Sequence, residues 1–366
     1  MTTSPALLPS GFRDRPPPAA EAQSALVRLL VDGFAARGYE RVAPPSVEHE
    51  GQLAHWLGRP PAALFRSSDP ATGAALALRP DITAQVGRIA ATRLAAEPRP
   101  LRLAYAGQVF RARVGQLSPA RELTQAGAEL IGSDGEPALA ELIETAAEAL
   151  TRAGVTDLSV DLALPDLVAA LAQLRWPVAD LDGLLAALDG KDWGALEAPE
   201  RRPYRALLEA AGPAETALAA LGAIAPDRAD RLASLAARLP GLRLTIDPTE
   251  RHGFEYQSWI GFSLFGAVEG QPLRSEIGRG GAYAIRHPDG RMEPAAGVSL
   301  YVDPLVDAGL GRAKDNRRLF LPWGTPAHVG VRLRAEGWVT IEAIEPGEGP
   351  GQATHIWNGA EPVARG

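Results

Sequence analysis

Two stretches with the composition of β-strands, separated by a short loop, most constrain how this chain can fold. Leu101–Arg113 and Glu122–Ile131 flank a segment that contains a glycine and a proline. Gln125 and Glu129 are four residues apart, so in a strand both side chains point to one face of a sheet. Arg111 lies before the loop, and the sequence does not determine the register that would fix its face. If the two stretches pair, one face could carry a cation, an amide and a carboxylate.

These three polar side chains could together bind a zwitterion, because a carboxylate binds an ammonium group and an arginine binds a carboxylate. The same pattern also fits the solvent-exposed face of a sheet, since the polar residues alternate with Ala, Leu and Ile. On the pattern alone, the solvent-exposed face is the favoured interpretation.

Composition restricts the classes of protein to which the chain can belong. Its 366 residues fit two domains, or one large domain with an insertion. Cysteine is absent, which excludes thiolate chemistry, cysteine zinc sites and disulfides. The net charge is −7, whereas proteins that mainly bind nucleic acid are more often basic. Without an apolar run of membrane-spanning length or a secretory signal, the expected location is the cytoplasm.

Hydrophobic periodicity and breaker residues predict the order of the elements. Asp81 and Thr83 are expected to be the cap and first-turn residues of a helix that reaches about Ala96. Further helices are predicted at Ala19–Arg37, Glu136–Arg152 and Ala295–Pro304, and an all-helical insertion at about 165–240. Strands are predicted at Leu242–Ile246, Phe254–Phe265, Leu273–Ile277, Ala282–His287, Ala327–Leu333 and Trp338–Ile344, with a loose tail at 345–366.

Two small features leave the chemistry open. Gly278–Gly281 is expected to lie between two strands, either as a plain tight turn or as a place where another group approaches the backbone closely. The six histidines, at 49, 55, 252, 287, 328 and 355, show no metal-ligand spacing. We therefore expect no metal site and no cofactor.

Taken together, these stretches resemble the histidyl-tRNA synthetases, which are class II aminoacyl-tRNA synthetases. Residues 36–48, 105–131 and 294–305 are similar to the three class II motifs, 78–83 to the histidine-contacting loop, and 252–257 and 278–283 to the histidine-specific motifs. The resemblance implies an α+β core at 1–318, built from an antiparallel β-sheet flanked by helices and carrying the helical insertion. It also implies a short C-terminal extension at 319–366 and a homodimer formed partly by the proline-ended strand at Tyr39–Pro45.

Three positions depart from that family where it holds ATP or stabilises the transition state. Arg113 replaces an acidic residue, His252 replaces a catalytic arginine, and Pro304 replaces an arginine that clamps phosphates. Losing one such charge contact costs on the order of 10² to 10³ in rate. Losing all three leaves no plausible adenylation.

The positions that bind the amino acid in that family are mostly kept. They are Asp81, Thr83, Arg111, Gln125, Glu129 and Tyr256, with Asp81 where Glu is usual and Gln257 where a tyrosine is usual. This combination resembles the regulatory subunits of ATP phosphoribosyltransferase, which are synthetase-like proteins. The resemblance implies a non-catalytic subunit that assembles with the short-form catalytic subunit and mediates feedback by histidine in histidine biosynthesis. It implies neither tRNA nor a membrane as partner.

Two other functions remain open from the sequence. The first is an active histidyl-tRNA synthetase-like ligase, against which Arg113, His252 and Pro304 count. The second is a scaffold whose pocket no longer binds anything, an interpretation that the substitution at Gln257 keeps open.

Overall fold

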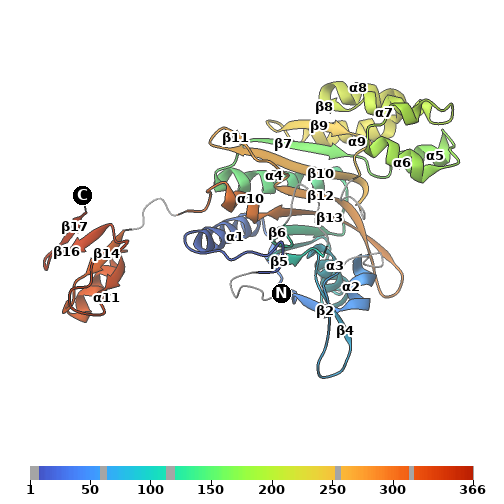
Figure 1. Cartoon of the computed structure of the whole chain (residues 1–366). Coiled ribbons are helices and arrows are strands. Elements are labelled where there is room, and N and C mark those ends of the chain that lie inside the picture. Colours follow the sequence, from blue (N-terminus) through green and yellow to red (C-terminus); the bar gives the residue numbers. More distant parts are fainter. Residues whose placement is uncertain (1–7, 58–63, 113–119, 252–256, 313–316, 366) are drawn as a thin grey trace, which may run out of the picture. The chain divides into compact units, whose positions relative to one another are not determined.

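The computed structural model describes residues 8–57, 64–112, 120–251, 257–312 and 317–365, and the chain divides into two compact units, 1–311 and 312–366 (Figure 1). No helix among the described residues is long and apolar enough to cross a membrane.

A ten-stranded sheet forms the centre of the first unit, in the order β1-β5-β6-β13-β12-β10-β7-β9-β8, with β11 paired to β10. Neighbours from β5 to β7 along this order are antiparallel, whereas β1 with β5 and β7 with β9 are parallel. The fold is therefore α+β with a mostly antiparallel sheet, as predicted. The strands are β1 Glu40–Arg41, β5 Leu101–Phe110, β6 Glu122–Ile131, β7 Thr156–Ala163, β8 Gly212–Pro213, β9 Arg243–Asp247, β10 Gln257–Val268, β11 Gln271–Pro272, β12 Gly278–Arg286 and β13 Met292–Tyr301.

The two faces of this sheet are covered differently. On one face, α1 (Ala19–Ala35), α4 (Glu136–Ala153) and α10 (Val302–Asp307) pack on even-numbered residues such as Ala128 and Val298. On the other face, α3 (Thr83–Thr92) packs on odd-numbered residues, including Leu103, Tyr105 and Ile285. The α3 helix contacts β6 and β12. It does not cover the whole of this second face, because a pocket lined partly by residues of β12 and β13 lies there.

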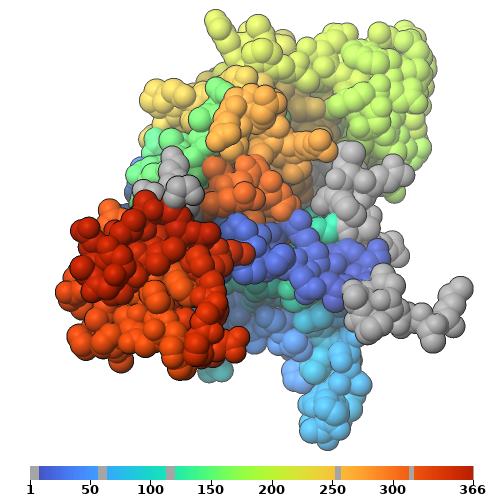
Figure 2. All heavy atoms as spheres, turned by 60° about the vertical axis from the view of Figure 1, so that its left-hand side comes forward, coloured from blue at the N-terminus to red at the C-terminus, as the bar shows by residue number. Residues whose placement is uncertain are grey.

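Two smaller parts extend the first unit. A three-stranded sheet of β2 (Val47–His49), β4 (Ala75–Leu78) and β3 (Arg66–Ser68) precedes α3, and the hairpin of β3 and β4 protrudes in light blue in Figure 2. The α2 helix (Glu50–Leu57) follows β2. The predicted insertion lies between β7 and β9 but includes the short strand β8 as well as helices. Those helices are α5 Leu167–Leu174, α6 Leu181–Asp189, two 3₁₀ turns at Gly194–Leu196 and Arg202–Tyr204, α7 Arg205–Glu209, α8 Ala214–Ile224 and α9 Pro226–Ala237.

Four predictions in the first unit were wrong. The helix expected at Ala295–Pro304 is strand β13 as far as Tyr301, because β13 pairs with β6 on one side and β12 on the other. Gly278–Gly281, which was expected to lie between two strands, is the beginning of β12, and the strand expected at Leu273–Ile277 is a bend. The helix expected to reach Ala96 ends at Thr92 and continues as turns.

The second unit is a four-stranded sheet in the order β15-β14-β16-β17, with one helix. Its elements are β14 Arg318–Leu321, α11 Ala327–Ala335, β15 Val339–Glu342, β16 His355–Trp357 and β17 Pro362–Ala364. The strand predicted at Ala327–Leu333 is therefore wrong. Val329 and Leu333 are four residues apart, so in a helix both reach the cluster of Leu319, Leu321 and Trp357. The tail predicted to be loose contains β16 and β17.

Candidate functional site

The pairing of β5 with β6 places the polar residues of this hairpin on one face. The register sets Leu103 opposite Glu129 and Gly107 opposite Gln125, and just beyond the strand ends the Arg111 N–H donates to the Arg121 carbonyl at 2.7 Å. Residues directly opposite share a face, and so do residues two apart. Arg111, Gln125 and Glu129 therefore point to the face that α3 leaves partly open.

A pocket of about 220 Å³ lies on this face. Of the six predicted binding residues, Asp81, Thr83, Arg111 and Glu129 line it, and Gln125 lies beneath it. Tyr256 lies outside the described residues, as do Arg113 and His252. The other lining residues are Pro80, Gln257, Arg279, Gly280, Gly281, Tyr283, Gly297, Ser299 and Tyr301.

The Glu129 carboxylate is buried completely at the base of the pocket. Its Oε1 accepts hydrogen bonds from the Thr83 hydroxyl at 2.8 Å and the Tyr105 hydroxyl at 3.0 Å, and its Oε2 accepts one from the Tyr283 hydroxyl at 2.8 Å. Burial raises the pKa of Glu129 to about 8, although these hydrogen bonds act in the opposite direction. A cation bound beside Glu129 would favour the ionised carboxylate.

Gln125 connects the two sides of the pocket floor. Its Nε2 donates to Asp81 Oδ2 at 3.2 Å and to Ser299 Oγ at 2.6 Å, and its Oε1 accepts from the Ile82 N–H at 3.2 Å. The N-cap of α3 is Ile82 and not Asp81 as predicted, but Asp81 Oδ1 still accepts from the Thr83 N–H at 2.7 Å. The Asp81 carboxylate is therefore held in one place by the helix and by Gln125.

The cations of the pocket lie around Tyr301. The Arg111 guanidinium lies over the Tyr301 ring, with Cζ 5.6 Å from the ring centre, and no described residue accepts a hydrogen bond from it. The Arg279 guanidinium pairs with Glu276 at 2.7 Å. The pocket thus carries the carboxylates of Asp81 and Glu129 together with the guanidinium groups of Arg111 and Arg279.

Glycines leave space for this arrangement. Gly297 lies opposite Glu129 in the register of β13 and β6, and a Cβ there would collide with the Glu129 carboxylate. Gly281 has a φ of +155°, and a Cβ there would lie 2.7 Å from Gln257 Cγ. Of the two interpretations left open for Gly278–Gly281, the close approach fits these contacts.

Several residues that line this pocket or hydrogen-bond to Glu129 were not predicted from the sequence. Tyr105 shares parity with Arg111, a signal that was available once β5 was predicted. Arg279, Tyr283, Ser299 and Tyr301 lie on alternate positions of β12 and β13. The sequence predicts that these four side chains share one face only if 278–301 is assigned to two strands.

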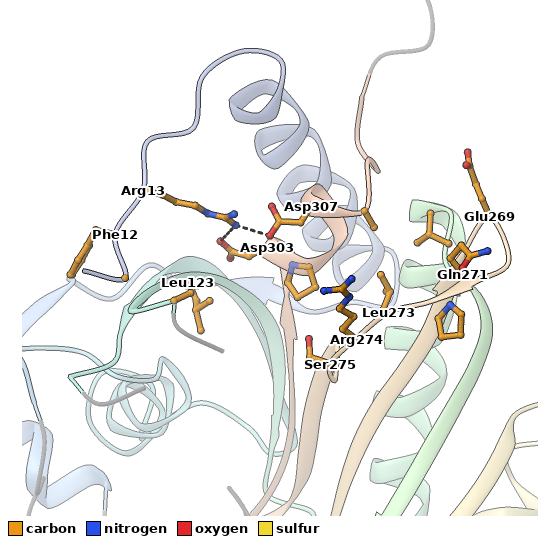
Figure 3. Close-up of a pocket in the computed structure, with 16 residues that line it drawn as sticks. Phe12, Arg13, Leu123, Glu269, Gln271, Leu273, Arg274, Ser275, Asp303 and Asp307 are labelled. Atoms are coloured by element: carbon orange, nitrogen blue, oxygen red, sulfur yellow. Dashed lines mark hydrogen bonds and ion pairs between the residues drawn. The ribbon is translucent and has the colours of Figure 1, made fainter. Parts of the chain in front are cut away.

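A larger hollow, about 890 Å³, lies beside the segment that resembles the third class II motif (Figure 3). Pro304 lines it together with Asp303 and Asp307. Arg13 donates to Asp307 at 2.8 Å and lies 3.7 Å from Asp303, and Arg15 also pairs with Asp303. Where the family carries an arginine for phosphates, this hollow presents a proline between two carboxylates. Elsewhere, the described residues contain no cluster of three His, Cys, Asp or Glu side chains that could bind a metal.

Comparison with known proteins agrees with this architecture. A sequence model of the histidyl-tRNA synthetase family matches residues 11–305. The ATP phosphoribosyltransferase regulatory subunit of Paramagnetospirillum magneticum is 45% identical, over 94% of this chain and 92% of that protein. The protein of the same name from Rhodospirillum centenum is 42% identical, over 95% of this chain and 92% of that protein.

Solved structures show the same fold at lower identity. A protein from Bacillus halodurans described as an ATP phosphoribosyltransferase regulatory subunit/histidyl-tRNA synthetase superposes with a TM-score of 0.78 at 23% identity, covering 93% of this chain and 94% of that one. The histidyl-tRNA synthetase of Nostoc gives 0.74 at 15% identity, covering 96% and 90%. The chain belongs to the family of ATP phosphoribosyltransferase regulatory subunits, which have the fold of histidyl-tRNA synthetase.

Proposed function

We propose that the chain is the non-catalytic regulatory subunit of an ATP phosphoribosyltransferase. In this proposal it assembles in the cytoplasm with a short-form catalytic subunit, which carries out the first step of histidine biosynthesis. Histidine bound to the chain mediates the feedback regulation of that step. The names of relatives that cover nearly the whole chain support this assignment.

The observation that supports the proposal is a pocket that contains both carboxylate and guanidinium groups. Glu129 and Asp81 would bind the ammonium group of histidine, and Arg111, whose guanidinium lies over Tyr301, would bind its carboxylate. Thr83 and Gln125 hold the two acidic residues in place, and Tyr256 would complete the set. A zwitterion matches this arrangement better than a simple anion or cation does.

The same structure argues against adenylation. Pro304 has no charge that could attract the phosphates of ATP, and its neighbours Asp303 and Asp307 in the larger hollow are carboxylates. The substitutions at 113 and 252 add to this argument from the sequence. Retention of the amino-acid pocket without the nucleotide clamps fits a sensor of histidine.

Histidine binding is tested by calorimetry on the wild type, Glu129→Gln and Arg111→Ala. Each variant loses one charge-assisted contact worth about 1.5–3 kcal/mol, so each should weaken binding by roughly ten- to a hundredfold. Glu122→Gln is the matched control, because Glu122 lies on the same strand but is exposed. Unchanged affinity in both pocket variants would place the regulatory site elsewhere.

A regulatory role also requires that histidine distinguishes two states of the protein. The same titration should therefore give different affinities for the free subunit and for the complex with the catalytic subunit. Equal affinities would contradict regulation through this pocket.

The alternative of an active ligase is tested by ATP–pyrophosphate exchange with histidine. We expect no histidine-dependent exchange above a blank, because three charge contacts to ATP and the transition state are replaced. Exchange well above the blank that disappears in Arg111→Ala would show that the chain is a ligase.

A further inference from the structure

Arg279 lies on the pocket face of β12, within the segment that resembles a histidine-specific motif, but it is not one of the six positions matched to the family's amino-acid-binding residues. It is directly opposite Ser263 of β10 and Ser299 of β13. Both neighbours are short, so the long Arg279 side chain can extend past them, and its guanidinium lines the same pocket as Arg111. Its side chain is 23% exposed, which places it where a ligand from solvent would meet it.

A carboxylate on the neighbouring bend orients this guanidinium. Glu276 Oε2 accepts hydrogen bonds from Arg279 Nη2 at 2.7 Å and from Nε at 3.2 Å, and also from the Ser263 hydroxyl at 3.1 Å. The Glu276 carboxylate thus orients the Arg279 guanidinium, and Arg279 lines the pocket.

Arg279 and Arg111 act on the same buried hydroxyl. Burial raises the pKa of Tyr301 and the Glu276 carboxylate raises it further, whereas the charges of Arg279 and Arg111 lower it. Both guanidinium groups are therefore electrostatic neighbours of Tyr301, and a ligand carboxylate placed beside that ring would feel two positive charges.

We propose that Arg279 is a second anion-binding residue of this pocket, which holds the carboxylate of a bound amino acid together with Arg111. This inference rests on the proposed function, since the ligand is an α-amino acid in both. It adds to the proposed function that the pocket binds a ligand with a carboxylate more tightly than an otherwise identical molecule without that charge.

Arg279 could instead be only the partner of Glu276 in a surface ion pair, and such pairs contribute little. A residue of that kind would affect the binding of all ligands alike, through the shape of the pocket. A residue that contacts the carboxylate would affect only ligands that carry one. The ratio of two affinities therefore separates the two roles.

The experiment measures by calorimetry the dissociation constants of histidine and of histidinamide, whose neutral amide replaces the carboxylate, for the full chain. In Arg279→Gln, histidine should bind about tenfold more weakly and histidinamide nearly unchanged, so the preference for histidine falls about tenfold. Arg279→Lys keeps the charge and should keep the preference within about threefold of the wild type. Arg274→Gln is the control, because Arg274 is exposed and lines the larger hollow instead. Comparing the ratio between variants cancels the intrinsic difference between the two ligands.

Each outcome bears on the inference. An unchanged ratio in Arg279→Gln, or equal weakening of both ligands, would overturn the role of Arg279 and leave the proposed function intact. A ratio in Arg279→Lys as low as in Arg279→Gln would also overturn it, since the charge would then not be what the pocket detects. If the wild type binds neither ligand, the proposed function fails and this inference fails with it.

Discussion

Glu129 is the residue on which the electrostatics of the pocket depend. It is completely buried, and its ordinary pKa of 4.5 rises to about 8 because burial outweighs three hydroxyl hydrogen bonds. The empty pocket therefore holds a largely neutral carboxyl group at pH 7. Binding an ammonium group would stabilise the ionised form of Glu129.

This shift makes the stability of the chain depend on pH. Between pH 4.5 and about 8 the folded chain retains a proton on Glu129 that the unfolded chain has lost. The free energy of unfolding that Glu129 contributes is therefore fully present below pH 4.5 and is lost as the pH rises through about 8. Glu129→Gln has no such proton to lose. Without ligand, its melting temperature relative to the wild type should rise by at least a few degrees from pH 5 to pH 8.5, as measured by calorimetry at both pH values.

Glu122→Gln serves as the control for that comparison. Glu122 is exposed on the same strand, so its variant should show the same difference from the wild type at both pH values. A Glu129→Gln difference as flat as that of the control would mean that Glu129 is already ionised in the folded chain.

At the level of single elements, the sequence predicted the strands in which polar and apolar residues alternate. β5 and β6 were predicted nearly to their ends, because polar and apolar residues alternate and a loop with Gly115 and Pro119 separates them. Four of the six predicted binding residues line the pocket. Strand parity fixes the face only for Arg111 and Glu129, whereas Asp81 and Thr83 lie at the beginning of α3. What the sequence could not supply was the register, which placed Arg111 on the same face as Glu129 only once the strands were paired.

β13 shows why the rest was missed. Its alanines at 295 and 296 have high helix propensity, and the segment was predicted to be a helix. In the structure both alanines are fully buried between β6 and β12, where pairing on two sides outweighs local preference. Gly297 on this strand is the position where only a hydrogen fits beside Glu129. Because β13 was not recognised as a strand, Ser299 and Tyr301 were not assigned to the pocket.

At the level of the whole molecule, the sheet of the first unit ends in an exposed edge. β1 is the outermost strand, and both of its residues, Glu40 and Arg41, are exposed. The Val42 N–H donates to the Ala104 carbonyl of β5 at 2.8 Å. Backbone groups alternate along a strand, so the Arg41 N–H points away from β5. An edge with free backbone groups is a template for pairing with another chain.

We therefore predict that the chain is a homodimer in solution and that the β1 edge is part of the contact. The resemblance at Tyr39–Pro45 implies such a dimer, and two-fold dimers are the commonest oligomers. Light scattering of the isolated chain should give at least twice its mass of 38.5 kDa. Arg41→Pro removes the outward N–H but leaves the bonds to β5, since proline is tolerated on an edge strand whose N–H faces solvent. It should shift the population towards the monomer, whereas Arg41→Ala, which keeps the N–H, should remain dimeric. A wild-type chain that is monomeric at micromolar concentration would contradict the dimer, and a dimer that persists unchanged in Arg41→Pro would place the contact on another surface.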